Sequence, residues 1–162
     1  MGLSILGIFH TVIGVGALIG ATVSLVKTGK IDLSRPSGLT YFYLTIVTCI
    51  SAVFVSKQPG LDPGKILSIL VAMLVLMAFY LSKKKPGKNR ARIIENLLLT
   101  FTLFLSMIPT TNETLSRLPV SHPLAHGPQD PLIKNTILVF FVLFILGSVL
   151  QFRKQKRINK VA

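Results

Sequence analysis

Apolar residues along this chain gather in five blocks that are separated by short polar segments. The blocks cover residues 3–26, 38–55, 66–81, 93–108 and 136–152, and the segments between them are rich in proline and glycine, which interrupt helices. A helix needs about 20 mostly apolar residues to cross a membrane, with a range of roughly 17–25. The pattern therefore predicts five transmembrane helices.

These blocks predict an all-α fold, an integral membrane bundle that forms a single domain over residues 1–162. A soluble all-α protein is the alternative, but five apolar blocks leave too little polar surface for a soluble fold. The first block also lacks the basic start of a signal peptide and is longer than its apolar region. We therefore interpret it as a retained span.

Composition supports a membrane protein, whereas the net charge taken alone would suggest a nucleic-acid-binding protein. The net charge is +13, and a strongly basic chain is typical of nucleic-acid binders. However, hydrophobic residues make up 51% of the chain and charged residues only 14%, which excludes a disordered basic tail and a typical soluble domain. The single cysteine, Cys49, rules out an internal disulfide framework and a zinc site built on paired cysteines.

Basic residues predict the orientation, because loops on the cytoplasmic side collect Lys and Arg. With five spans, one side carries Lys27, Lys30, Arg35, Lys83, Lys84, Lys85, Lys88, Arg90, Arg92, Arg153, Lys154, Lys156, Arg157 and Lys160, and the other carries Lys57, Lys65, Arg117 and Lys134. This asymmetry places the N-terminus outside and the C-terminus inside. It predicts an outer loop over 109–135 and a basic cytoplasmic tail over 153–162, in a membrane that we take to be the bacterial cytoplasmic (inner) membrane.

The same asymmetry changes the meaning of the positive charge. It becomes a topology signal rather than a nucleic-acid footprint, so no nucleic-acid partner is expected. The basic segments can also contact anionic lipid headgroups at the cytoplasmic face, at about 1 kcal/mol per basic residue.

Three histidines are the strongest candidates for a ligand site at the outer face. His10 lies about two turns into the first block, and His122 and His126 lie in the outer loop. Imidazole suits a transition metal or haem, although no spacing here identifies which metal, if any, would bind. The alternative is a packing or hydrogen-bonding role for His10 inside the bundle.

Small residues surround His10 on the first helix. Gly14 and Ala17 share its face at helical spacing, and Gly16 and Gly20 form a GxxxG motif beside it. Small residues let another helix approach closely, so this part of the helix is predicted to pack within the chain or in a dimer.

Glu95 is the only acidic residue inside a predicted span. It shares a helix face with Thr102 and Ser106, and Asn96 and Thr100 extend the polarity of that face. The stripe can line an intramembrane polar path, or it can be a hydrogen-bonded seam between helices. Glu95 itself can instead form an interfacial ion pair with Arg92, one turn away.

The first part of the chain resembles a family of small, uncharacterised bacterial multi-pass membrane proteins. The resemblance rests on His10, Gly14, Ala17, Leu18 and Gly20, followed by Arg35, Gly38 and Tyr41, and it extends to the segment 109–119. The resemblance implies a second histidine just before Arg35, and this chain has Ser34 there. The family implies no settled activity.

No nucleotide-binding, hydrolase or metalloprotease motif is present in the sequence. The sequence therefore favours a non-enzymatic accessory or binding subunit of a membrane assembly, either as a homo-oligomer or within a larger complex. Two alternatives stay open: a redox or metal- or haem-binding protein that uses the outer-face histidines, and a small oligomeric transporter or channel that uses Glu95.

Overall fold

The computed structural model describes residues 4–55, 60–84, 89–119 and 121–161. Within these ranges the chain is all-helical, and its helices are α1 (Ile5–Thr28), α2 (Pro36–Val55), α3 (Pro63–Lys84), α4 (Asn89–Arg117) and α5 (Pro131–Val161). All five are long and apolar enough to cross a membrane. The predicted all-α bundle of five membrane helices is confirmed, whereas the orientation of its termini stays a prediction. Leu3, the first residue of the predicted first span, and Ala162, the last of the predicted tail, lie outside the described residues.

Capping side chains and prolines explain where several helices begin. The Ser4 hydroxyl accepts a hydrogen bond from the backbone N–H of Gly7 and caps α1. Three other helices, α2, α3 and α5, begin with proline, which is favoured at the first helical position because its missing N–H has no partner there anyway. Asp130 precedes the proline of α5, and its carboxylate accepts from the N–H of Leu132.

Helix α4 continues past the residue at which the sequence predicts a loop. The outer loop was expected over 109–135, but α4 runs through Pro109 to Arg117 and α5 begins at Pro131. A membrane helix tolerates proline when Ser and Thr side chains satisfy nearby backbone groups. Here the Thr110 hydroxyl donates to the carbonyl of Ser106 at 2.8 Å, and Arg117 forms an ion pair with Glu113 one turn earlier. The connection between the two helices therefore covers only 118–130.

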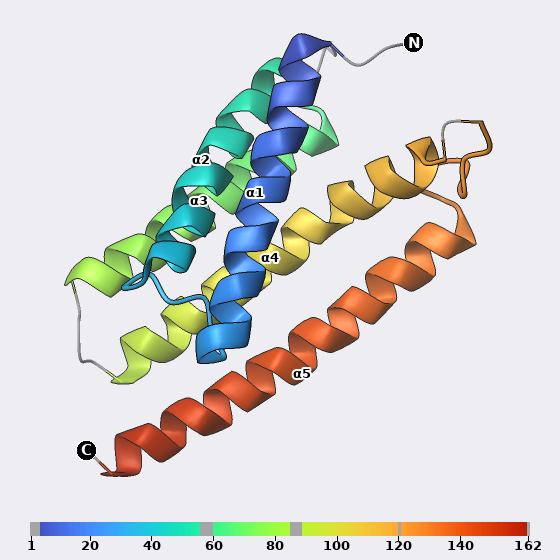
Figure 1. The fold of residues 1–162 in the computed structure, drawn as a ribbon. Coiled ribbons are helices and arrows are strands. Elements are labelled where there is room, and N and C mark those ends of the chain that lie inside the picture. Colours follow the sequence, from blue (N-terminus) through green and yellow to red (C-terminus); the bar gives the residue numbers. More distant parts are fainter. Residues whose placement is uncertain (1–3, 56–59, 85–88, 120, 162) are drawn as a thin grey trace.

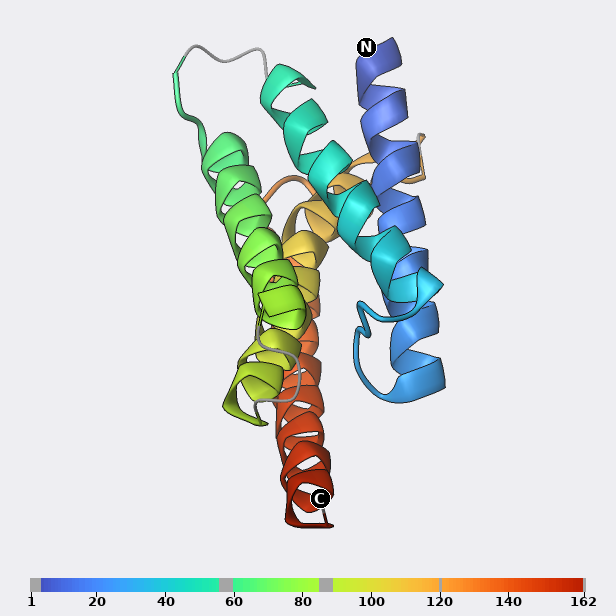
Figure 2. The same ribbon diagram turned by 90° about the vertical axis from the view of Figure 1, so that its left-hand side faces the viewer.

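Consecutive helices pack side by side, α1 on α2, α2 on α3, α3 on α4 and α4 on α5 (Figure 1). Figure 2 shows the alternation of direction that five spans require. The start of α1 and the 118–130 connection lie toward one end, which we call the N-terminal end of the bundle. The α1–α2 connection and the end of α5 lie toward the other, the C-terminal end.

The hydrophobic core lies among the first four helices. Its buried residues are Ala17, Ala21, Ile31, Leu33, Tyr41, Phe42, Cys49, Val71, Val75, Ala78, Leu99 and Leu105. None of the α5 residues whose burial the structure describes belongs to this cluster. Helix α5 is joined to α4 through partly buried rings, with Phe104 stacked on Phe144 at a centroid distance of 5.6 Å.

The α1–α2 hairpin is tightly closed at its connection. The fully buried Ser24 hydroxyl of α1 donates to the carbonyl of Lys30 at 3.1 Å and accepts from the N–H of Asp32 at 2.9 Å. Ile31 and Leu33 are buried against the core, at 0% and 1% exposure. Two side chains of this connection are therefore part of the hydrophobic core, while Gly29, Ser34 and Arg35 are exposed.

Candidate functional site

The small residues of α1 lie against α2. A Cβ atom added at Gly20 would stand 3.0 Å from the backbone nitrogen of Tyr41, and one at Gly16 would stand 2.9 Å from a terminal carbon of Leu44. Ala17 is buried in the same contact, while a Cβ at Gly14 would meet only ordinary van der Waals distances. The GxxxG motif thus forms a close contact within the chain.

His10 is held by a hydrogen-bonded pair across the α1–α2 interface. Its Nδ1 atom lies 2.9 Å from the Oγ of Ser51, and the Ser51 hydroxyl donates its proton to the carbonyl of Thr48. The pair forms with either neutral tautomer of His10, because the Ser51 hydroxyl can both donate and accept. The imidazole therefore links α1 to α2.

The other two candidate histidines lie in the connection between α4 and α5, where their side chains are exposed. The backbone N–H of His126 donates to Asp130 at 3.0 Å, and this bond, with the one from Leu132, lowers the pKa of the Asp130 carboxyl. Throughout the described parts of the chain, no group of three or more His, Cys, Asp or Glu side chains could hold a metal ion. His122 therefore joins no such cluster with His10 and His126.

Glu95 is buried at the C-terminal end of the bundle, with 7% of its surface exposed. Ser82 of α3 and the charges of Lys30, Asp32 and Arg92 lie close enough to act on its carboxyl group. The expected partner Arg92 is thus one of several charges around this carboxyl. Lys30 and Ser82 are neighbours that sequence spacing alone does not bring close to Glu95.

Thr102 and Ser106 lie further along the same side of α4 and meet α2. The fully buried Tyr41 hydroxyl lies 2.9 Å from the Thr102 Oγ1, which itself donates to the carbonyl of Leu99. Ser106 donates to the carbonyl of Thr102 at 2.9 Å. Fully buried Leu99 stands between Glu95 and Thr102 on this side, so the polar groups form separate contacts. The arrangement favours a hydrogen-bonded seam over a continuous polar path.

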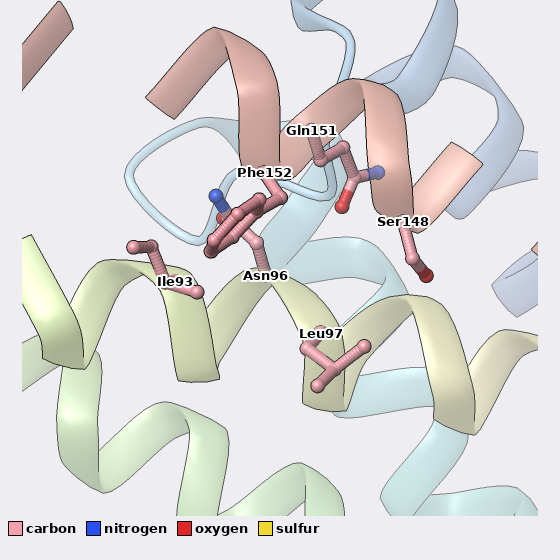
Figure 3. Close-up of a pocket in the computed structure, with 6 residues that line it drawn as sticks. All are labelled: Ile93, Asn96, Leu97, Ser148, Gln151 and Phe152. Atoms are coloured by element: carbon pink, nitrogen blue, oxygen red, sulfur yellow. The ribbon is translucent and has the colours of Figure 1, made fainter. Parts of the chain in front are cut away.

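Asn96 and Thr100 face α5 rather than extending that stripe. The Thr100 hydroxyl lies 2.8 Å from the carbonyl of Asn96 and 3.0 Å from the Oε1 of Gln151 on α5. A small pocket lies at this contact, lined by Ile93, Asn96, Leu97, Ser148, Gln151 and Phe152 (Figure 3). Gln151 and Ser148 are among the residues that sequence reasoning missed, as is Ser51, the partner of His10. The only signal of Gln151 and Ser148 was polarity near the end of an apolar block, which marks a boundary as readily as a contact.

Comparison of the chain with protein-family models, with curated proteins and with solved structures found no match. Five helices that are long and apolar enough to cross a membrane are consistent with a multi-pass integral membrane protein.

Proposed function

We propose that this membrane protein is a non-enzymatic accessory subunit of a larger assembly in the bacterial cytoplasmic membrane, with its N-terminus outside and its C-terminus in the cytoplasm. The polar groups of the bundle support a binding role. His10, Tyr41 and Thr102 are engaged in contacts between helices, and fully buried Leu99 separates the groups that would have to form a path.

The one-sided packing of α5 carries this proposal. Only 6% of the apolar 18-residue stretch of α5 is buried, whereas 33% of the corresponding stretches of α2 and α4 is buried. Leu143 and Leu150 are 56% and 65% exposed, and Gly147 lies between them on the same helix face. This face therefore offers a long apolar surface with a small residue at its middle.

The glycine at position 147 favours a partner helix, rather than lipid alone, as the neighbour of this face. A Cβ added there would meet no atom within 4 Å, so nothing in the described chain requires the glycine. Glycine in a helix costs about 0.5–1 kcal/mol relative to alanine, and lipid tails gain nothing from its missing side chain. A second helix does gain, because small residues allow backbones to approach closely.

Charge indicates which kind of partner helix fits. Beyond its apolar face, α5 carries the exposed residues Arg153, Lys154, Lys156 and Arg157. A second copy docked side by side along α5 would bring two such basic ends together, and like charges repel. We therefore assign the face to a transmembrane helix of another protein whose cytoplasmic end carries Asp or Glu.

Native mass spectrometry of the complex extracted in mild detergent tests this assignment. We expect a hetero-complex whose partner has such an acidic end, which Gly147→Leu disrupts and the matched control Val142→Leu preserves. An added Cβ at Gly147 would meet no atom within 4 Å, and an unchanged thermal unfolding profile of Gly147→Leu would separate loss of binding from misfolding. A protein that is purely monomeric or homodimeric, or a complex indifferent to Gly147→Leu, would contradict the proposal.

A further inference from the structure

One basic side chain at the end of α5 is held in place by a contact with α1. The Nζ atom of Lys154 donates a hydrogen bond of 3.0 Å to the backbone carbonyl of Thr28, the last residue of α1. A Cβ atom added at Gly29, the next residue, would lie only 3.2 Å from that nitrogen, so the missing side chain leaves room for the ammonium group. The contact therefore positions Lys154 beside the end of α1.

Lys154 also belongs to the face of α5 that we assign to a partner helix. It comes seven residues after Gly147 and four after Leu150, which correspond to two turns and one turn of an α-helix. Lys156, by contrast, lies with its ammonium over the Phe152 ring, 4.6 Å from the ring centroid. The apolar face thus ends at a positioned cation that lies about 10 Å along the helix axis from its glycine.

The ammonium group of Lys154 can bind a further acceptor. Lysine carries three N–H donors, and the neutral carbonyl of Thr28 accepts from one of them. The described parts of the chain contain no Asp or Glu that forms an ion pair with Lys154. A carboxylate that accepts from an ammonium forms a charge-assisted hydrogen bond, which is roughly twice as strong as a neutral one. Because Thr28 already orients the ammonium, the side chain has less freedom to lose on binding.

We propose that Lys154 binds the Asp or Glu side chain of the partner helix and thereby sets the register of that helix on α5. This inference rests on the proposed function and specifies the partner further. The partner helix should place a small residue beside Gly147, where two backbones can approach closely, and a carboxylate beside Lys154. Its sequence should therefore contain Gly, Ala or Ser and an acidic residue about seven positions apart.

The stability of the hetero-complex in mild detergent tests this assignment. Lys154→Gln keeps an N–H donor for the Thr28 carbonyl but removes the charge, and we expect it to raise the dissociation constant at least about tenfold. The matched control Lys83→Gln removes one exposed charge from α3 at the same end of the bundle and should change the dissociation constant less than about twofold. Unchanged thermal unfolding profiles of both variants would separate weaker binding from misfolding.

Reductive methylation of lysine amines, read by mass spectrometry, gives a second result that needs no variant. The Lys154 amine should be protected in the complex and should react in the separated subunit. Equal reactivity in the two states would overturn the inference, as would equal effects of Lys154→Gln and Lys83→Gln. Protection of the separated subunit by phosphatidylglycerol vesicles alone would also overturn it, because the ligand would then be a lipid phosphate.

The two proposals can fail separately. A complex that Gly147→Leu disrupts and Lys154→Gln leaves intact would overturn the register and leave the proposed function standing. A partner whose sequence has no acidic residue about seven positions from a small one would do the same. The absence of any hetero-complex would overturn both.

Discussion

The close contact between α1 and α2 allows a sharp test, because one helix carries two glycines in contrasting surroundings. At Gly20 an added Cβ would lie 3.0 Å from the backbone nitrogen of Tyr41 and 3.1 Å from the carbonyl oxygen of Ser37. At Gly14 the nearest atom would be a methyl carbon of Thr48 at 3.6 Å, an ordinary contact. Alanine should therefore be tolerated at Gly14, whereas at Gly20 it should push the helices apart.

The magnitude follows from two opposing effects. Replacing a helical glycine with alanine gains about 0.5–1 kcal/mol from backbone entropy at either position. Overpacking costs typically 1–3 kcal/mol, and here it applies only at Gly20, whose neighbours are backbone atoms that cannot rotate away. Because the entropy gain cancels in the comparison, Gly20→Ala should be less stable than Gly14→Ala by about 1–3 kcal/mol.

Reversible unfolding in mixed detergent micelles measures this difference directly, with both variants compared to the unchanged protein. Gly14→Ala should be neutral or more stable than the unchanged protein. Equal stabilities for the two variants, within about 0.5 kcal/mol, would refute the claim that Gly20 is where the backbones of α1 and α2 meet.

Two further predictions concern the seam and the topology. Tyr41→Phe should lower the free energy of unfolding by about 0.5–1.5 kcal/mol, because it removes the hydroxyl paired with Thr102. The control Tyr43→Phe changes an exposed side chain and should alter that free energy little, so equal effects of the two substitutions would contradict the buried pair. In a Cys49→Ser background, His122→Cys should react with a membrane-impermeant maleimide on intact cells, because His122 is exposed in the connection predicted to lie outside. Labelling that occurs only after lysis would show that the predicted orientation is wrong.

The sequence predicted the helices well because their signal is local. Apolar blocks mark the hydrophobic part of each span, and every block falls within one helix of the structure over its described residues, apart from the capping residue Ser4. The ends were harder to predict. Pro109 indicated a loop because proline normally ends a helix, but α4 continues to Arg117, and its last turns contain the Thr110–Ser106 hydrogen bond and the Arg117–Glu113 ion pair. The Asp130-Pro131 pair was a usable start signal for α5 that an apolar pattern does not register.

The polar contacts were harder to predict because they depend on which helix meets which face. Glu95 and Asn96 are adjacent in the sequence, yet Glu95 meets Ser82 of α3 while Asn96 lies in the pocket against α5. Helical periodicity gives the direction of a side chain relative to its own axis and carries no information on its neighbours. For the same reason the pairing of His10 with Ser51 could not be read from the spacing of the histidines.

The packing of each helix on the one before it has a consequence for biogenesis. A ribosome delivers the helices to the membrane in chain order, and here each new helix packs against the helix made just before it. The closed α1–α2 hairpin, with its connection anchored on Ser24, needs nothing from α3 to α5 to satisfy those connection hydrogen bonds. The bundle can thus assemble by addition while it is synthesised, and the outward face of α5, the last helix to join, stays uncovered by the other four helices.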